Sequence, residues 1–279
     1  MTTAITTMSN MKSILSTLNK LPVPCNSYEL NASKTGPKVL VNAFPKAGTN
    51  LLLRVVSLLP TLVPRWQEHL TNNTPSLLQE VSKIRKGQYL SGHVHWKPEL
   101  SNVLNSNNIR SLLIIRDLRD IAVSNFYYIT YKSPDHRLHS YFNSLKSDEE
   151  RLMASIVGVD GKFLEDGIRS KSIGEHARDY APWFNEPTCL IVRFEDLIGS
   201  EGGGSDDQQL NTVRAITNHL GIELSEEQIA QIASQAFFKN STTFRKGEIG
   251  DWQNHFNEAI SRAFNEVAGE VLVKFGYTD

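Results

Sequence analysis

Cysteine is scarce in this sequence: only Cys25 and Cys189 occur among its 279 residues. Two cysteines are too few for a disulfide framework or a cysteine-rich zinc cluster, and such sparse use fits a reducing compartment. The chain also lacks any run of about 18 apolar residues, and its N-terminus has no apolar stretch long enough for a signal peptide. We therefore expect a soluble protein in the cytoplasm.

An excess of charge of either sign is also missing. The 29 lysines and arginines nearly balance the 30 aspartates and glutamates, which leaves a formal net charge of -1. A balanced chain has no overall basic field that would recruit nucleic acid or an anionic membrane surface, so we expect neither partner. Any anion site must therefore be local.

Short apolar segments alternate with segments of helical periodicity along the chain. The expected strands are residues 38–44, 88–95, 111–117 and 189–196. The expected helices are residues 49–59, 118–131, 173–184 and 208–220, a further helix that starts at Ser225, and a last one at 257–275. Strands of continuous apolar character are typical of a sheet that is covered on both faces. The pattern predicts an α/β fold with a mainly parallel central sheet and helices on both faces.

The same pattern predicts how the domain is organised. We expect residues 36–279 to form a single domain and residues 1–35 to form an N-terminal extension. No internal repeat of solenoid or propeller period is visible. In parallel sheets of this kind, ligands bind at the C-terminal ends of the strands. The residues considered next follow such ends.

The segment "VNAFPKAGTNLLLRVV", from Val41 to Val56, predicts a strand, a tight loop and a helix. A helix N-terminus has unpaired N–H groups and a partial positive charge, so it binds an anion well. The usual phosphate loop, G-x-x-x-x-G-K-[ST], places its lysine after the second glycine. Here Lys46 precedes Gly48. The segment is therefore a P-loop-like variant for some anion.

A second candidate lies in "IIRDLRDIAVS", where Arg116 closes a strand and Ser124 follows in the next helix. An arginine fork and a serine hydroxyl can hold one phosphate together. The alternative is an ion pair at the helix start, between Arg116 and Asp117 or Asp120. This segment alone does not decide between a phosphate contact and an ion pair.

A third candidate is the basic turn in "TTFRKGEIGDWQNHF", where Arg245 and Lys246 precede Gly247. The simpler reading of a basic turn is solvated surface.

A fourth candidate is "SGHVHW", where His93 and His95 should share one face of the expected strand. No third ligand is near in sequence, so we expect no metal there. For His95 the simpler reading is a half-buried side chain whose hydrogen bonds are satisfied.

Taken together and in this order, "FPKAGTN", "RDLRDIAVS" and "FRKGEIGDWQNHF" resemble the signature regions of sulfotransferases that use 3′-phosphoadenosine-5′-phosphosulfate (PAPS). The resemblance implies that the loop wraps the phosphosulfate, that the arginine and serine hold the 3′-phosphate with the basic turn, and that His93 is the general base. The implied donor-binding residues are Pro45, Lys46, Ala47, Gly48, Thr49, Asn50, Arg116, Ser124, Phe194, Arg245, Lys246 and Gly247.

The chain departs from the family pattern in its loop. Ala47, Asn50 and Leu51 stand where the family usually has serine, threonine and tryptophan. The missing tryptophan removes an aromatic platform for adenine, a place that Phe194 or Phe244 could take. The family's dimer segment aligns with residues 253–262, which keep none of its key residues, so we expect no dimer by that route.

The resemblance implies an in-line sulfuryl transfer. The hydroxyl or amine of a small, polar acceptor attacks sulfur while His93 takes its proton and Lys46 stabilises the leaving phosphate. Lysine, arginine and the helix N-terminus supply the positive charge, so no metal is expected. Acceptor contacts should come from residues 59–88 and 127–173. Two alternatives stay open: a P-loop small-molecule kinase that needs ATP and magnesium, and a non-catalytic module that binds adenosine 3′,5′-bisphosphate (PAP).

Overall fold

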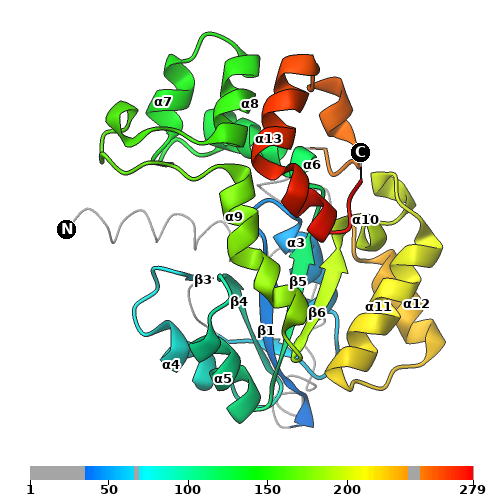
Figure 1. The fold of residues 1–279 in the computed structure, drawn as a ribbon. Helices are drawn as coiled ribbons and strands as arrows, with labels where there is room; N and C mark the ends of the chain where they lie inside the picture. Colours follow the sequence, from blue (N-terminus) through cyan, green and yellow to red (C-terminus); the bar gives the residue numbers. More distant parts are fainter. Residues whose placement is uncertain (1–34, 66–68, 238–245, 279) are drawn as a thin grey trace.

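A parallel β-sheet lies at the centre of the computed structural model, which describes residues 35–65, 69–237 and 246–278 (Figure 1). Its order is β2-β4-β1-β5-β6, and β3 also pairs with β4. Every pairing is parallel, and Val41 of β1 aligns with Ser91 of β4 on one side and with Leu112 of β5 on the other. The strands are β1 (Lys38–Ala43), β2 (Val63–Pro64), β3 (Leu70–Thr71), β4 (Gln88–His93), β5 (Ile109–Ile115) and β6 (Cys189–Arg193). The predicted α/β fold with a parallel sheet is confirmed.

Both faces of the sheet are buried, which explains the continuous apolar runs of its strands. Leu40 and Leu113 point into one core, while their neighbours Val41 and Leu112 point into the other. Each such side chain contributes roughly 1.5–3 kcal/mol when it is fully buried. Alternation of side chains across the two faces therefore gives two cores instead of one apolar and one polar face.

Two layers of helices cover the sheet (Figure 1). Buried side chains of the first core come from α4 (Leu77–Ser82), α5 (Pro98–Ser106), α6 (Leu118–Tyr127), α7 (His139–Ser144), α8 (Asp148–Val157), α9 (Ile173–Tyr180) and α13 (Glu258–Lys274). Those of the second core come from α3 (Thr49–Ser57), α10 (Phe194–Leu197), α11 (Asp206–Leu220) and α12 (Glu226–Ser234). Among the described residues, no helix is both long and apolar enough to cross a membrane.

Helix boundaries follow local chemistry. Ser225 and Gln228 form a capping box at the start of α12, as predicted. The predicted helix 173–184 ends earlier, because Pro182 lacks an N–H and the chain continues as the 3-10 helix Ala181–Asn185. Helix α6 gives way to a π-helix at Tyr128–Lys132, a rare form that occurs often at functional sites.

One expectation about the strands is wrong. Strand β4 ends at His93, so His95 lies beyond it and does not share a strand face with His93. The side chain of Asn42 replaces the next strand pairing, because its Nδ2 donates to the Val94 oxygen (2.8 Å) and its Oδ1 accepts from the Val94 nitrogen (2.9 Å). Since Trp183 Nε1 also donates to the Val94 oxygen (3.0 Å), this stretch of backbone leaves the sheet with its hydrogen bonds satisfied.

The order of the strands places a switch point at β1. The chain adds β4 on one side of β1 and then β5 on the other, so the connections diverge at the C-terminal ends of these strands. Ligands of doubly wound sheets bind at such a point. Lys46, His93, Arg116 and Phe194 follow or end β1, β4, β5 and β6 respectively, which puts all four at this edge.

Candidate active site

The loop between β1 and α3 is a tight turn. The Phe44 N–H donates to the Ile114 oxygen (3.0 Å), and the Ala47 N–H donates to the Phe44 oxygen (3.0 Å). Lys46 has a left-handed backbone with φ of 69°. A non-glycine residue in this region costs about 1–3 kcal/mol and is typical of functional loops. The turn thus holds Lys46 in a left-handed backbone conformation, which lysine does not favour.

Gly48 caps α3, and only glycine suits its position. Its φ is 106°, a value that residues with a side chain rarely adopt. A Cβ at Gly48 would lie 2.7 Å from the ring of Phe194, the first residue of α10. The helix N-terminus is therefore in close contact with an aromatic ring that comes from the end of β6.

The Lys46 side chain lies over the ring of Tyr128, with its Nζ 3.7 Å from the ring centroid. Tyr128 begins the π-helix that follows α6. A cation–π contact of this kind contributes about 0.5–2 kcal/mol. The lysine of the loop is therefore positioned from two directions, by its own strained backbone and by an aromatic ring.

His93 is tied to the strand that leads into this loop. Its Nδ1 lies 2.7 Å from the backbone oxygen of Ala43, the last residue of β1. A carbonyl oxygen can only accept, so Nδ1 carries the proton and Nε2 of the neutral ring has a free lone pair. Burial and the charge of Lys46 lower the pKa of His93, against the opposing effect of the carbonyl bond. The tautomer and the neutral state both suit a general base.

A second imidazole packs against His93. The ring centroids of His69 and His93 are 4.3 Å apart at an angle of 66°. His69 Nδ1 is 2.9 Å from the Ser91 hydroxyl, and its buried Nε2 has no hydrogen-bond partner among the described residues. Burial, with a smaller effect of His93, lowers the pKa of His69 to about 3. His69 is thus a neutral group with one hydrogen-bonding atom available beside the candidate base.

Arg116 is buried at the end of β5, with only 6 % of its surface exposed. Its guanidinium carbon lies 4.2 Å from the centroid of the Phe194 ring. One of its NH2 groups donates to the backbone oxygen of Glu248 (2.6 Å). The same group lies 3.4 Å from the carboxylate atom Oδ2 of Asp120. Arg116 therefore forms the predicted ion pair with Asp120 and, in addition, a hydrogen bond to the distant residue Glu248.

Asp120 holds the basic turn against the start of α6. Its two carboxylate oxygens accept from the backbone N–H groups of Gly250 and Trp252, each at 2.9 Å. Within the same turn, Lys246 Nζ is 2.8 Å from the buried carboxylate of Asp251. Since Asp120 also faces Arg116, one buried carboxylate organises both predicted parts of a 3′-phosphate site.

The structure therefore brings most of the predicted donor residues to one edge of the sheet. The Phe194 ring lies beside Gly48 and against the Arg116 guanidinium, and Glu248 joins the turn of Lys246 and Gly247 to Arg116. The other predicted residues of the loop are half-buried Pro45 and Thr49, buried Ala47 and exposed Asn50, and Ser124 is half-buried on α6. Arg245 and Phe244 lie outside the described residues.

Sequence reasoning missed the residues that support this site. Asn42 was treated as part of an apolar strand, although a lone amide in "VLVNAF" signals a buried hydrogen-bonding role. Glu195 accepts from the Asp117 backbone N–H (3.0 Å) and from the Tyr277 hydroxyl (2.6 Å), and burial raises its pKa. The contact with Tyr277 could not be read from the sequence, because the two residues are far apart in the chain.

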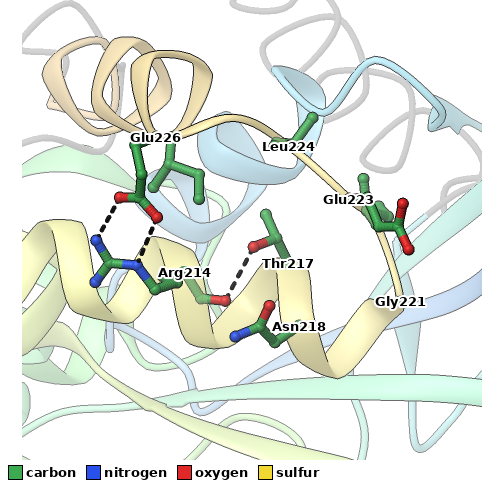
Figure 2. A pocket seen from close by; sticks show the side chains of 9 residues that line it. Arg214, Thr217, Asn218, Gly221, Glu223, Leu224 and Glu226 are labelled. Atoms are coloured by element: carbon green, nitrogen blue, oxygen red, sulfur yellow. Dashed lines mark hydrogen bonds and ion pairs between the residues drawn. The ribbon is translucent and has the colours of Figure 1, made fainter.

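A surface hollow of about 400 Å³ lies away from this site, between α11 and α12 (Figure 2). Arg214 and Glu226 form an ion pair at its rim, with Arg214 NH2 2.6 Å from Glu226 Oε2. None of the predicted site residues lines it. We assign no function to this hollow.

Comparisons with known proteins identify the family of the chain. The family model described as a sulfotransferase domain matches residues 36–276. Sulfotransferase 6B1 of Danio rerio is 24% identical over 252 residues, which cover 82% of this chain and 76% of that protein. Sulfotransferase 2A1 of Rattus norvegicus is 22% identical over 265 residues, 85% of each chain.

Two solved structures have a similar fold. Mouse sulfotransferase SULT7A1, solved with PAP, superposes with a TM-score of 0.61 at 18% identity and covers 91% of this chain and 94% of its own. Retinol dehydratase, solved with androsterone and PAP, has a TM-score of 0.57 at 16% identity, with 88% and 85% covered. With a family model that spans nearly all of the described residues, the chain belongs to the sulfotransferase family, as its three motifs predicted for a PAPS-dependent sulfotransferase.

Proposed function

We propose that this enzyme moves the sulfuryl group of PAPS to a hydroxyl or amine of a small, polar molecule, with His93 as the general base. The donor side is supported by Arg116, which stacks on Phe194 beside Gly48, and by the turn that Asp120 holds. The two similar structures were solved with PAP, the product that PAPS leaves after transfer.

The single observation that carries the proposal is the bond between His93 Nδ1 and the Ala43 oxygen (2.7 Å). It orients Nε2 as a proton acceptor, and it joins the base to the strand that ends at the donor loop. Base and loop are therefore held at a fixed separation through β1 and β4. A positioned base of this kind contributes about 10²- to 10⁴-fold to a rate.

The proposed reaction is an in-line displacement at sulfur. The acceptor oxygen or nitrogen forms a bond to sulfur, His93 Nε2 takes the acceptor proton, and the bond between sulfur and the bridging oxygen breaks so that PAP leaves. Lys46 turns from the Tyr128 ring toward that oxygen and exchanges a cation–π contact for a charge-assisted hydrogen bond. Lysine, arginine and the N-terminus of α3 supply the positive charge, so we propose a transfer step without a metal.

A polar acceptor is supported by the groups around the base. His69 is neutral and offers a buried Nε2 beside His93. The predicted contact regions 59–88 and 127–173 contribute this histidine and Tyr128 to the site. Acceptors that carry a second polar group next to the nucleophile should therefore bind better than flat apolar phenols.

We also propose that residues 36–279 act as one domain after the extension of residues 1–35, in the cytoplasm, without nucleic-acid or membrane partners. The mismatch of residues 253–262 with the family's dimer segment supports the absence of a dimer by that route.

The test is transfer of labelled sulfate from PAPS to a panel of alcohols, phenols, amines and guanidines, with PAP and ATP binding measured in parallel. We expect turnover with a polar alcohol or amine, and much tighter binding of PAP than of ATP. ATP-dependent phosphorylation that requires magnesium would establish the kinase instead. PAP binding without turnover on any acceptor would leave a non-catalytic binding module.

A further inference from the structure

Three metal-ligating side chains lie together beyond the end of β4. His95, His176 and Asp179 each offer a ligand atom, and these atoms lie within 4.8 Å of one another. In the part of the chain that the structure describes, no other group of three or more such side chains is this close. We propose that these residues bind a divalent transition metal of the Zn²⁺ type, at a site separate from sulfuryl transfer.

Two of the ligands are fixed by one helix. His176 and Asp179 are three residues apart on α9, so they project from the same face. A capping box of Ser172 and Glu175 starts this helix one turn earlier and satisfies its first N–H groups. The pair is therefore presented by a well-defined helical turn.

The third ligand comes from the chain that leaves the sheet. The His95 backbone N–H donates to Asn72 Oδ1 (2.8 Å), and the His95 ring packs edge-on against Tyr180 with 5.1 Å between centroids. These contacts hold its Nδ1 3.6 Å from Asp179 Oδ2. The neighbouring His93 does not belong to this group of ligand atoms.

Two imidazoles and one carboxylate form a donor set that suits zinc and similar divalent ions. Metal–ligand bonds of about 2.0–2.2 Å need donor atoms closer together than 4.8 Å, a change that side-chain rotation can supply. The cluster is half-buried, so solvent can complete the coordination. The three residues thus have the chemistry and the proximity for a site with an open position.

Lys171 competes for the same carboxylate. Its Nζ is 2.6 Å from Asp179 Oδ2, and its side chain is 41% exposed. An exposed ion pair of this kind is worth at most about 1 kcal/mol, so the ammonium can move into solvent when a metal binds. This competition predicts that removing the charge of Lys171 strengthens metal binding. A cluster with a purely structural role would show no such change.

The position of the cluster indicates what a metal would do. Tyr180 contacts His95 on one side and Phe44, at the start of the donor loop, on the other (4.9 Å between centroids). A metal would therefore join α9 to the chain after β4 behind the loop. We expect it to stabilise this corner of the fold and not to enter the transfer reaction.

The test uses untagged, chelator-treated full-length protein and Co²⁺ as the probe, followed by its visible absorption and by titration calorimetry. We expect one Co²⁺ per chain, displaced by Zn²⁺, and a midpoint of thermal unfolding roughly 5–10 °C higher at about 100 times the dissociation constant. His176→Ala and Asp179→Asn should each weaken binding at least about 10-fold. Lys171→Met should strengthen it about 2- to 5-fold.

His219→Gln is the matched control, because it removes a histidine of α11 that bonds to the Ser111 oxygen instead (3.0 Å). It should bind Co²⁺ as the wild type does. Asp179→Asn keeps the shape of the side chain and so serves if His176→Ala fails to fold. Absence of saturable binding with one ion per chain, equal affinity in the wild type and Asp179→Asn, or weaker binding by Lys171→Met would each overturn the proposal.

Discussion

The proposed donor side and the proposed acceptor side of the site are built differently. On the donor side, Arg116 and Phe194 are almost fully buried and stack on each other next to Gly48. On the acceptor side, His69 and His93 are half-buried; His69 precedes β3, and His93 is the last residue of β4. One side is packed like a core, whereas the other contains a neutral imidazole whose buried Nε2 has no hydrogen-bond partner among the described residues.

This difference in packing predicts different roles for the donor side and the acceptor side. Tight packing gives the donor side a fixed shape for one ligand, since a buried site tolerates little change in volume. The acceptor side depends on the orientation of a few imidazoles. Changes on the donor side should therefore alter PAP affinity, and changes on the acceptor side should alter turnover while leaving donor binding intact.

The largest expected effect is on the acceptor side, at the base. His93→Ala should lower kcat by about 10²- to 10⁴-fold, because it removes the proposed general base, whose Nε2 is oriented to take the acceptor proton. PAP affinity should be almost unchanged. Both quantities are measured at saturating donor, by turnover and by calorimetry.

His95→Ala is the matched control, two residues further along the chain and beyond the strand. It should leave kcat almost unchanged, and any effect should be confined to the KM of the acceptor. A large loss of kcat in His95→Ala, with His93→Ala nearly as active as the wild type, would reverse the assignment of the base.

The next effect is on the donor loop. Lys46→Ala should lower turnover by about 10²- to 10³-fold, the scale of losing one donor that stabilises developing charge. Donor binding should weaken less, which a comparison of kcat with the PAP dissociation constant will show.

Lys274→Ala is a suitable control for Lys46→Ala, because Lys274 is an exposed lysine of α13 that pairs with Glu270 (2.7 Å). Its turnover should equal that of the wild type. If Lys46→Ala also kept wild-type turnover, Lys46 would have no part in the chemistry.

A smaller effect is expected for donor selectivity. PAP should bind much more tightly than AMP, and Arg116→Ala should reduce that difference by about 2 kcal/mol, a typical charge-assisted contact. Arg137→Ala, which removes an exposed arginine paired with Asp166, should leave it unchanged. Equal affinities of the wild type for PAP and AMP would exclude a 3′-phosphate site at Arg116.

The smallest expected effect is on the free energy of unfolding, through the contact between Gly48 and the Phe194 ring. Gly48→Ala places a Cβ against the Phe194 ring at a φ of 106°, whereas Gly203→Ala meets only open space at a φ of 85°. Both variants should lose stability, but Gly48→Ala should lose about 1 kcal/mol more, because only it overpacks. Denaturant unfolding measures the difference, and equal losses would mean that the contact with Phe194 is not tight.

Local chemistry made much of the fold predictable. The strands at β1, β4, β5 and β6 were expected within a few residues because their runs are apolar on both faces. The strands β2 and β3 and the helices α4, α5, α7 and α8 were not expected; each of the two strands is only two residues long, which is too short for a strand pattern. The expectation that His93 and His95 share a strand face was wrong because Asn42, from another strand, ends the pairing.

The sequence by itself determined the α/β class, the family and the loop that carries Lys46 and Gly48, because strands, caps and glycine turns depend on residues close together in the chain. Only the tertiary structure decided the tautomer of His93, the stacking of Arg116 on Phe194, and the meeting of His95 with His176 and Asp179. Each of these rests on contacts between residues tens of positions apart. Such contacts are set by the packing of helices on the sheet, which no local pattern in the sequence records.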